Sequence, residues 1–465
     1  MWRLFYNIIL LVVSPFIVAI LLAKQRCRPG LLQRLGLQDS QSGLSRRPDL
    51  PDRPNEPDRL DRPPQPVIWI HAVSLGEVVA VTPLVHELHR RHPAYRLVVS
   101  TVTETGREAV EHRLAGVADH CYAPLDFPWV VARFIERLQP CLYLFVETEL
   151  WPNLLWYLHR RGVPTALVNG RLSSKSFARQ QWPPVRSFYR TMLQQLSLCL
   201  MQSDRDVDRI IALGADALRV RRTGNIKFDQ PISAVTEGGT TRAHLGLQST
   251  EQLFVAGSTH PGEEEILVEC YRALVTQCPS AVLLLAPRHI ERAESVEAMI
   301  RARGLAVQRR STIGQAGALM STGPRVVVLD SRGELAAIYR EAVVAFVGGT
   351  LVPIGGHNLL EPAQWAKPVL FGPYTDHFEE IADLLILAGG GRRVLQAEDL
   401  TRQVLALFSD DEARERMGRS ARQVVEQNQG ALQQTLEAID RLLTPQQGTS
   451  GSPLADRPLP LMAGR

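Results

Sequence analysis

A carboxylate stands where a buried apolar strand gives way to an amphipathic helix, early in the chain. Residues 67–78 read VIWIHAVSLGEV, in which an apolar, β-prone run leads through a short turn to Glu77. In α/β folds, ligands bind where strands end and helices begin, at the carboxyl edge of the sheet. Glu77 is therefore a candidate general base. The alternative is a capping box, because Ser74 and Glu77 have the spacing of that motif.

Other charged side chains follow predicted strands of the first half of the chain. The segment CLYLFVETELWPN (141–153) brings Glu147 and Glu149 to a strand end, where they could serve chemistry or lie in a solvated turn. The segment TGNIKFD (223–229) places Lys227 at a predicted hinge, where a cation could reach a phosphate. An ordinary exposed lysine is the alternative there.

A basic and aromatic stretch covers residues 169–190. Cations and aromatic rings are interleaved in it: Arg171, Lys175, Phe177, Arg179, Trp182, Arg186, Phe188, Tyr189 and Arg190. Such a pattern is typical of a half-buried helix with a solvated basic face. In a protein held at a membrane, the same cations could bind phosphorylated lipid headgroups.

Four turns suited to phosphate follow predicted strands of the second half. They are GSTHPGEEE (257–265), APRH (286–289), DSRGELAAIY (330–339) and GGTLVPIGGHNLLEP (348–362). Free N–H groups at a helix start attract anions, and glycines permit close backbone approach to a ligand. One such turn often only reverses the chain. Four at successive strand ends predict a nucleotide pocket.

Metal and nucleic-acid functions find little support in the composition. No histidine pairs with another ligand at the spacing of a zinc site or a facial triad, so we expect no metal and no cofactor. The formal net charge of +4 over 465 residues argues against a nucleic-acid partner. The six cysteines form no CxxC pair and are typical of free thiols in a reducing compartment.

The elements that must position these residues alternate between strands and helices. Apolar runs predict strands at 67–73, 96–102, 141–147, 164–169, 198–202 and 218–223, and again at 253–258, 281–287, 325–329, 342–349 and 368–372. Helical patterns lie between most of them, which predicts parallel sheets with right-handed crossovers. The fold class is therefore α/β, with two Rossmann-like domains expected to face each other across a cleft.

Five segments are expected along the chain. They are a membrane anchor helix (1–23), a juxtamembrane segment with a Pro/Asp/Arg-rich linker (24–66), a first α/β domain (67–230), a second α/β domain (231–444) and a flexible tail (445–465). The linker composition can bury almost nothing. A polar, Gly-rich stretch at 228–243 suggests the domain junction, and a charged amphipathic helix over 411–443 could close the second domain.

The N-terminal apolar run predicts a membrane anchor. Residues 4–23 are nearly unbroken apolar sequence, and twenty helical residues span about 30 Å, the thickness of a bilayer core. Lys24, Arg26 and Arg28 follow the run whereas only Arg3 precedes it, so the positive-inside rule puts the body of the protein in the cytoplasm. A cleaved signal peptide is the alternative, but it would carry its charges before the run.

Together these motifs resemble those of the Kdo transferases of lipopolysaccharide assembly. The matching strings keep the family order over about residues 67–375: WIHAVSLGEV, ETELWPN, NGRLSSKS, TGNIKFD, GSTHPGEEE, APRH, RGEL and GGTLVPIGGHNLLEPA. The resemblance implies a GT-B fold and metal-independent, inverting transfer of Kdo, an acidic ketose, from CMP-Kdo to a lipid A precursor such as lipid IVA. It also implies an enzyme at the cytoplasmic face of a Gram-negative inner membrane. The segment 38–66 departs from the family in its greater length.

The same resemblance assigns roles to residues. Glu77 would be the general base, which its helix N-terminus should keep ionised, while Glu147 and Lys227 would support the transition state. CMP would be held by Pro287, Arg288, Gly333, Glu334, Leu335, Asn358, Leu359, Leu360 and Glu361. The lipid acceptor or membrane headgroups would contact Arg171, Lys175 and Arg179.

Two alternatives from other classes stay open. One is another GT-B-type enzyme, such as a different membrane glycosyltransferase or a sugar-nucleotide epimerase, although an epimerase needs neither an anchor nor the basic stretch. The other is a non-catalytic, membrane-tethered nucleotide-binding protein, which would not need Glu77. Binding of cytidine nucleotides without turnover would support this last alternative.

Overall fold

The chain forms two compact units. The computed structural model describes residues 1–23, 30–37, 65–230, 242–313 and 323–444. The first unit comprises the chain up to Gly224 together with the segment from Ala431 onward, and the second comprises Asn225–Gly430. The predicted tail lies outside the described residues, as do most of the predicted segment 24–66 and most of the predicted junction at 228–243. Within 24–66, residues 30–37 are described and include a short helix, α2 (Leu31–Arg34).

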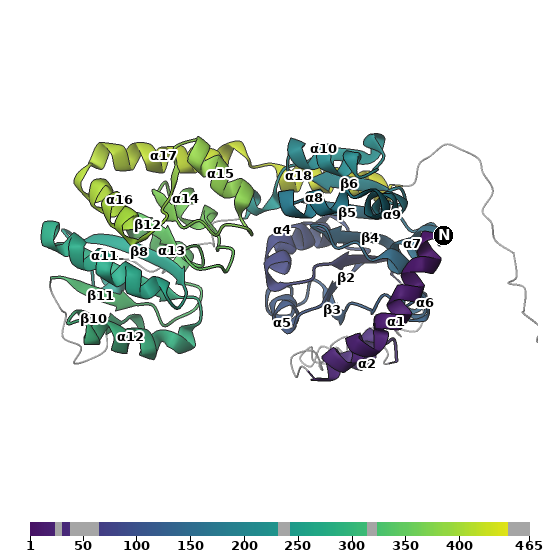
Figure 1. Ribbon diagram of the computed structural model, residues 1–465, viewed down its shortest axis with the longest axis horizontal. Helices are drawn as coiled ribbons and strands as arrows, with labels where there is room; N and C mark the ends of the chain where they lie inside the picture. Colours follow the sequence, from purple (N-terminus) through teal and green to yellow (C-terminus); the bar gives the residue numbers. More distant parts are fainter. Residues whose placement is uncertain (24–29, 38–64, 231–241, 314–322, 445–465) are drawn as a thin grey trace, which may run out of the picture. The chain divides into compact units, whose positions relative to one another are not determined.

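The first unit is built on a seven-stranded parallel sheet with the order β3-β2-β1-β4-β5-β6-β7 (Figure 1). Its strands are β1 (Val67–His71), β2 (Arg96–Thr101), β3 (Asp119–Tyr122), β4 (Pro140–Val146), β5 (Thr165–Gly170), β6 (Leu198–Met201) and β7 (Val220–Arg222). The strand order reverses between β1 and β4. In open α/β sheets, ligands bind at the carboxyl ends of the strands beside such a switch point.

Helices flank this sheet and keep its central strands buried. They are α1 (Trp2–Ala23), α2 (Leu31–Arg34), α4 (Leu75–Arg91), α5 (Glu104–Arg113), α6 (Pro128–Leu138), α7 (Pro152–Arg160), α8 (Ser174–Gln180), α9 (Pro183–Leu193), α10 (Asp204–Ala212), η3 (Ala217–Arg219) and α18 (Ala431–Leu443). All five residues of β1 are buried, which explains its unbroken apolar run. In the core, Trp69 packs against Phe134 and Tyr143 at ring-centroid distances of 5.1 and 4.6 Å.

The second unit repeats this architecture, with a parallel sheet in the order β10-β11-β9-β8-β12-β13-β14. Its strands are β8 (Gln252–Thr259), β9 (Ala281–Pro287), β10 (Ala306–Arg309), β11 (Arg325–Val328), β12 (Ala342–Val347), β13 (Val369–Phe371) and β14 (Gly391–Arg393). The strand order reverses beside β8, so β8 and β12 mark the switch point of this sheet.

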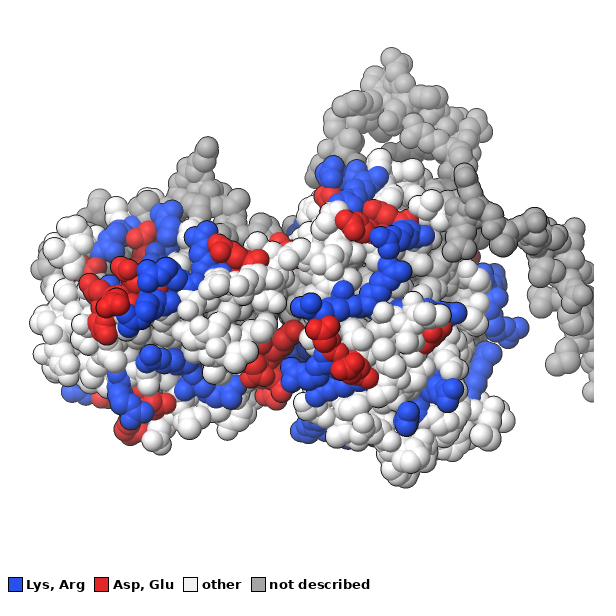
Figure 2. Space-filling view, turned by 90° about the horizontal axis from the view of Figure 1, so that it is seen from above, with Lys and Arg blue, Asp and Glu red and all other residues white. Residues whose placement is uncertain are grey.

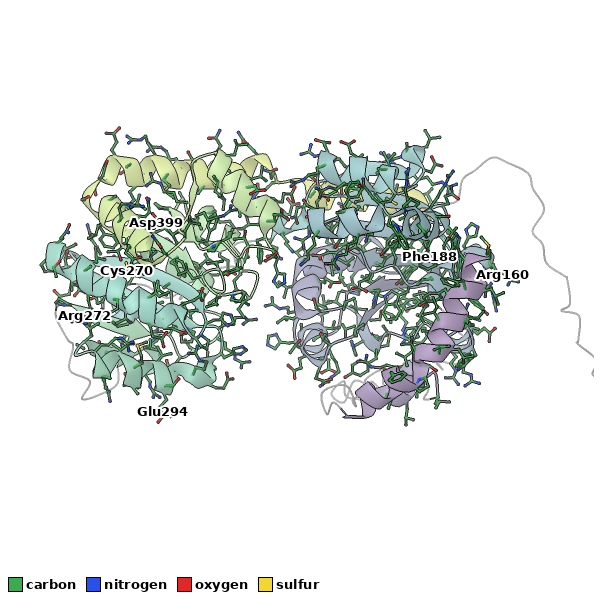
Figure 3. All side chains as sticks on the ribbon, viewed as in Figure 1. Arg160, Phe188, Cys270, Arg272, Glu294 and Asp399 are labelled. Carbon is green, nitrogen blue, oxygen red and sulfur yellow. The ribbon has the colours of Figure 1, made fainter. Side chains whose placement is uncertain are left out.

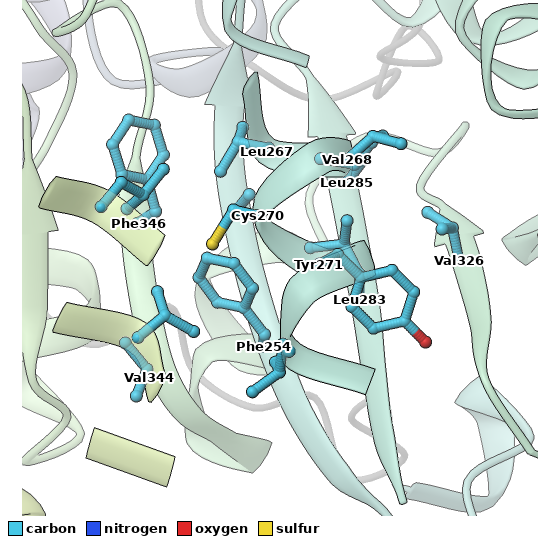
Figure 4. Packing of buried hydrophobic residues seen from close by; sticks show 14 of the residues in the cluster. Phe254, Leu267, Val268, Cys270, Tyr271, Leu283, Leu285, Val326, Val344 and Phe346 are labelled. Carbon is cyan, nitrogen blue, oxygen red and sulfur yellow. The ribbon is translucent and has the colours of Figure 1, made fainter. Parts of the chain in front are cut away.

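The helices of the second unit cover its sheet. They are η4 (Ile226–Asp229), η5 (Arg242–Leu245), α11 (Glu263–Gln277), η6 (Ile290–Arg292), α12 (Ala293–Ala302), η7 (Arg310–Thr312), α13 (Leu335–Ile338), η8 (Tyr339–Glu341), α14 (Leu360–Gln364), α15 (Glu379–Leu387), α16 (Ala397–Ser409) and α17 (Asp411–Gln427). Figure 4 shows the Cys270 sulfur of α11 next to the Phe254 ring of β8, and the Tyr271 ring beside Leu283 of β9. The Tyr271 hydroxyl reaches the carbonyl oxygens of Ala281 (2.8 Å) and Arg325 (2.9 Å), so this buried polar group is satisfied.

The domain boundaries differ from the sequence predictions at both ends of the second unit. It begins at Asn225 instead of 231, and residues 431–443 belong to the first unit as α18. The predicted single helix over 411–443 is two helices, because the chain turns at Gly430, whose φ is 102°. On α18, Asp440 accepts hydrogen bonds from Arg91 (3.2 Å) and His92 (2.7 Å) of the first unit, which explains the assignment.

The predicted membrane anchor forms a helix, α1, that lies along α6 and α7 (Figure 1). Three of its side chains form hydrogen bonds with other parts of the first unit: Trp2 donates to Ser187 (3.0 Å), Tyr6 to Asp126 (2.9 Å) and Asn7 to Asn153 (3.0 Å). Across the described segments, no helix combines the length and the apolarity that crossing a membrane requires. The prediction of a transmembrane anchor is therefore not supported.

Candidate active site

Glu77 lies on the first turn of α4, directly after the carboxyl end of β1. Its Oε2 accepts a hydrogen bond from the backbone N–H of Val73 (2.9 Å), and its Oε1 accepts one from the Ser74 hydroxyl (3.2 Å). The side chain is half-buried at the switch point of the sheet. The structure thus places the candidate base where an open α/β sheet binds its ligand.

The capping-box interpretation of Glu77 does not hold. In a capping box, the N-cap hydroxyl accepts from the N3 backbone N–H, and the N3 carboxylate accepts from the N-cap backbone N–H. The Ser74 side chain makes no cap hydrogen bond and instead donates to the Glu77 carboxylate. The carboxylate bonds to the N–H of Val73, one residue before the N-cap. Glu77 is therefore not explained by helix capping.

The electrostatic surroundings of Glu77 suit a base that works near neutral pH. Burial is the largest influence and raises its pKa to about 7, while the hydrogen bond from Val73 opposes that shift. The charges of Glu147 and Glu149 raise it further. We expected the helix N-terminus to keep Glu77 ionised, but burial raises its pKa so far that the carboxyl is only partly ionised near neutral pH. A base is most effective when its pKa lies near the working pH.

Glu147 and Glu149 come to Glu77 because β1 and β4 are neighbours in the sheet. Glu147 immediately follows β4, in the left-handed region with φ 60°, which is uncommon for a residue with a side chain. Burial raises the pKa of Glu149, and the charge of Glu147 adds to it. The sequence-predicted carboxylates therefore form one cluster at the switch point.

His71 is the last residue of β1 and is buried close to these carboxylates. Its Nδ1 lies 2.8 Å from the Ser100 hydroxyl, which also accepts from the Trp69 indole N–H (2.8 Å). Burial lowers the pKa of His71 to about 4, so the ring is neutral. His71 supports the packing of β1 against β2 and is not a proton carrier at neutral pH.

The basic residues predicted to contact an acceptor lie after the carboxyl end of β5. Arg171 is half-buried in the turn, whereas Lys175 and Arg179 are exposed on α8. Asp206 and Arg209 of α10 fix this turn, because they bond to the backbone N–H (2.8 Å) and carbonyl of Leu172. The turn is thus held in place, and Lys175 and Arg179 of the helix that follows it remain exposed.

A hollow of about 830 Å³ lies at the opposite edge of the same sheet. It is lined by residues of α9 and of the connections that precede β6 and β7, including Arg186, Arg190 and Arg219. Because these connections enter the amino ends of parallel strands, the hollow is separate from the Glu77 cluster. The one carboxylate among its lining residues, Asp216, pairs with Arg219 (3.4 Å).

In the second unit, the predicted nucleotide residues gather at the carboxyl edge of the sheet. Arg288 is exposed at the end of β9, and its backbone N–H bonds to the Thr259 carbonyl (2.9 Å). Gly333, with φ 87°, leads into Glu334, which caps the turn by accepting from Ser331 and pairs with Arg310 (3.0 Å). Glu334 is thus partly committed to protein contacts.

The Asn358–Glu361 segment starts helix α14. The Asn358 side chain accepts from the backbone N–H of Leu360 (3.1 Å) and lies 3.4 Å from a carboxylate oxygen of Glu361. Leu359 and Leu360 are fully buried in the core, so only their backbone could touch a nucleotide. Pro287 is buried too, whereas Leu335 is half-buried.

The glycine-rich turns of this unit do not offer their amides freely to a ligand. Glu263, at the start of α11 and fully buried, accepts from the N–H groups of His260 (2.9 Å), Gly349 (2.8 Å), Thr350 (3.0 Å) and Leu351 (2.9 Å). Sequence reasoning missed this role, although the run of glutamates in GEEE was a signal for it. The expected anion site at this helix start is therefore filled by the protein's own carboxylate.

Lys227 lies in η4 of the second unit, with its Nζ 5.3 Å from the ring centroid of Phe378. Its predicted action together with Glu77, which is in the first unit, stays a prediction. Among the described residues, no group of three or more His, Cys, Asp or Glu side chains is arranged to hold a metal ion. On the face of each unit seen in Figure 2, acidic and basic side chains are interspersed.

Comparison with known proteins adds the family to this geometry. A family model described as 3-Deoxy-D-manno-octulosonic-acid transferase (kdotransferase) matches residues 39–230. A 3-deoxy-D-manno-octulosonic acid transferase of Haemophilus influenzae is 35% identical over 444 residues, which cover 94% of this chain and 98% of that protein. This chain belongs to the 3-deoxy-D-manno-octulosonic acid (Kdo) transferase family. A second Kdo transferase, from Bordetella pertussis, is 36% identical and covers 80% of this chain and 86% of its own length.

Solved structures of other enzymes share the fold. A UDP-N-acetylglucosamine 2-epimerase from Neisseria meningitidis, bound to UDP-GlcNAc, has a TM-score of 0.56 at 12% identity and covers 81% of this chain and 99% of its own. A putative epimerase of the same kind from Listeria monocytogenes has a TM-score of 0.54 at 15% identity, with 81% and 96% covered. Such identities show the shared GT-B-type fold alone. The assignment of this Kdo transferase family member as a glycosyltransferase rests on its membership of the family and not on its fold.

The raised pKa of Glu77 predicts a stability effect of Glu77→Gln. A raised carboxyl pKa means that the folded state disfavours the charge, so the penalty is absent below about pH 4.5, grows with pH and is complete above about 7. Gln keeps the hydrogen bond from Val73 without a charge. We expect the variant to be more stable than the wild type by about 1–3 kcal/mol at pH 8.

Calorimetric midpoints of the first unit at pH 8 and pH 4.5 measure this difference, at about 2–4 °C per kcal/mol. Glu108→Gln is the matched control, because Glu108 is exposed on α5, and its midpoints should follow the wild type at both pH values. A Glu77→Gln variant that is less stable than the wild type at pH 8 would show that the carboxylate is a structural anchor.

Proposed function

We propose that this chain transfers Kdo from CMP-Kdo to a lipid A precursor such as lipid IVA, by inverting displacement without a metal. The observation that carries the proposal is the half-buried Glu77, whose pKa is about 7 and which helix capping does not explain. The relatives from Haemophilus influenzae and Bordetella pertussis, both named as Kdo transferases, support the transferred sugar.

The chemistry assigned to Glu77 is removal of one proton. During attack of the acceptor hydroxyl on the anomeric carbon of Kdo, the carboxylate takes the hydroxyl proton as the new C–O bond forms. The bond from the anomeric carbon to the phosphate oxygen breaks on the opposite side, and CMP leaves with the electron pair. Glu147, which raises the pKa of Glu77, thereby makes it a stronger base.

The second unit is assigned to the nucleotide. Arg288 is an exposed fixed cation at the end of β9, where it could stabilise the departing phosphate. Asn358 and Glu361 offer polar side chains at the start of α14, and Leu359 and Leu360 offer backbone groups. Lys227 is the further cation that the family motif assigns to the transition state. No resident cofactor is part of this proposal, since CMP-Kdo is the donor substrate.

We also place the enzyme at the cytoplasmic face of the inner membrane, where a lipid acceptor resides. The support is the outer face of α1, on which the following apolar side chains are at least 41% exposed: Leu4, Phe5, Ile8, Ile9, Leu11, Val12, Val13 and Phe16. An apolar helix face of this kind binds in the interfacial region of a bilayer without crossing it.

Cations lie beside this apolar face. Phe188 of α9 packs against Trp2 and Tyr6 of α1 at centroid distances of 5.9 and 5.8 Å, so α9 and α1 are in contact (Figure 3). On α9, Arg186 and Arg190 line the hollow at the amino edge of the sheet, and neither makes an ion pair with a described residue. Anionic headgroups would supply the missing negative charge.

Turnover separates the catalytic proposal from its alternatives. Glu77→Gln cannot take a proton, so release of CMP in the presence of CMP-Kdo and lipid IVA should fall by a factor of about 10²–10⁴. The wild-type rate should decline as pH falls through about 7. The rate of the variant should not show this decline, because Gln does not titrate. Excess EDTA should leave the wild-type rate unchanged.

A Glu77→Gln enzyme within a few-fold of the wild-type rate would contradict the assignment of the base. Loss of activity in EDTA that magnesium restores would contradict the metal-free mechanism. Binding of CMP without any turnover of CMP-Kdo by the wild type would favour a nucleotide-binding protein. Mass analysis of the lipid product distinguishes Kdo transfer from the reaction of another glycosyltransferase.

Vesicle binding measures the membrane proposal. The double variant Arg186→Glu/Arg190→Glu should bind vesicles with anionic lipid more weakly than the wild type by about tenfold or more at low salt. Its control, Arg272→Glu/Arg301→Glu, reverses two charges on exposed positions of α11 and α12 in the second unit and should bind as the wild type does. Equal weakening by both pairs would refute a specific contact through α9.

A further inference from the structure

Two histidines form a direct hydrogen bond at the switch point of the second sheet. His260 follows β8 and His357 lies in the loop after β12, and their Nε2 atoms are 2.8 Å apart. The rings are nearly parallel, at 3°, with centroids 5.1 Å apart. Because β8 and β12 are adjacent where the strand order reverses, the pair occupies the position at which an open α/β sheet binds its ligand.

The pair is held rigidly by the elements that carry it. Glu263 binds the backbone N–H of His260 and, through Gly349, the first residues of the loop that contains His357. A Cβ on Gly349 would stand 3.0 Å from Cδ2 of His357 and 3.5 Å from Cδ2 of His260, so both rings lie against this glycine. The contact between the imidazoles is therefore built into the fold.

Fixed positive charge lies close to the pair, from Arg288 after β9 and from Arg292 in η6. Two further histidines, His289 after β9 and His377 after β13, are also near it. The nearby carboxylates are engaged elsewhere, because Glu263 binds backbone amides and Glu264 pairs with Arg292 (2.7 Å). Burial, and then electrostatic interactions with Arg288 and the other groups around the pair, lower the pKa of His357 to about 3 and also lower that of His260. Without a ligand the pair is neutral.

The hydrogen bond lets the pair accept one further proton without breaking. In the neutral pair, one Nε2–H donates to the other Nε2, which leaves the Nδ1 of the donor ring as a base. A proton from solvent on that Nδ1 makes the donor ring an imidazolium, and its Nε2–H still donates to the neutral partner. A second proton would place two N–H groups face to face, so the capacity of the pair is one.

We propose that the His260–His357 pair binds the phosphodiester of the nucleotide-sugar donor and takes up one proton from solvent as the donor binds. The inference rests on the proposed function and adds a binding group to the same site. The anion offsets the surrounding positive charge, which favours the imidazolium form. By linkage, the donor then binds more tightly as pH falls. Histidines that showed no metal spacing in the sequence thus acquire a role in holding the donor.

The test uses a probe whose own charge does not titrate. Cytidine 5′-methyl phosphate is a phosphodiester with one fixed negative charge, whereas CMP gains a proton near pH 6. Titration calorimetry of the full chain, in buffers of different ionisation enthalpy between pH 5.5 and 8, gives the protons taken up per probe bound. We expect uptake approaching one proton, and an affinity that weakens by up to about tenfold per pH unit as pH rises.

His260→Gln and His357→Gln keep hydrogen-bonding groups but cannot titrate, so uptake should fall towards zero in both while the probe still binds. His86→Gln is the control, because His86 is a histidine of the first unit bonded to the Arg113 carbonyl (3.2 Å), and its uptake should equal that of the wild type. Probe binding by the wild type without proton uptake would overturn the inference, even if the variants fail to fold. Unchanged uptake in both variants would also overturn it. Absence of probe binding by the wild type would overturn the donor site itself.

Discussion

Both units depend on one constraint, which is that parallel strands bring distant segments of the chain to a common edge. The order of each sheet reverses beside its first strand, between β1 and β4 in one and between β8 and β12 in the other. The reversal leaves space at the carboxyl ends, since neighbouring crossover helices lie on opposite faces. Glu77 meets Glu147 there in the first unit, and His260 meets His357 in the second. Both groups of side chains thus lie where an open α/β sheet leaves room for a ligand.

Two buried glutamates show how surroundings decide what a carboxylate can do. Glu263 accepts hydrogen bonds from four backbone N–H groups, two on each oxygen, and thereby fixes the turns after β8 and β12. Glu77 accepts one backbone N–H and one hydroxyl and lies near two other carboxylates. Its charge is incompletely compensated, so it binds a proton near neutral pH. The structural residue and the candidate base thus have the same side chain and differ in the groups that donate hydrogen bonds to it.

The central strands were all predicted, whereas three of the four edge strands were missed. The eleven strands expected from apolar runs are all present. Ten of them lie inside the sheets, where burial on both faces favours continuously apolar sequence, and the eleventh is the edge strand β7. The strands that were missed, β3 (DHCY), β10 (AVQR) and β14 (GRR), all lie at sheet edges, where partial exposure permits polar residues. Some glycines of the predicted nucleotide turns have a structural role instead of the predicted one. Those at 257 and 348 make room for the Tyr339 hydroxyl and the Ser258 backbone, which would stand 1.9 and 2.4 Å from an added Cβ, and not for a ligand.

The sequence by itself determined the α/β class, the two-domain plan and the motifs that place the chain in its family, because strand burial and motif order are local properties. Only the tertiary structure decided that Glu77 is no capping residue, that α18 belongs to the first unit and that α1 packs on the body through Trp2, Tyr6 and Asn7. It also decided that His260 and His357, 97 positions apart, share a hydrogen bond. These outcomes depend on which segments meet across the sheets. Contacts between distant segments are set by long-range packing. The periodicity and composition of a single segment do not predict them.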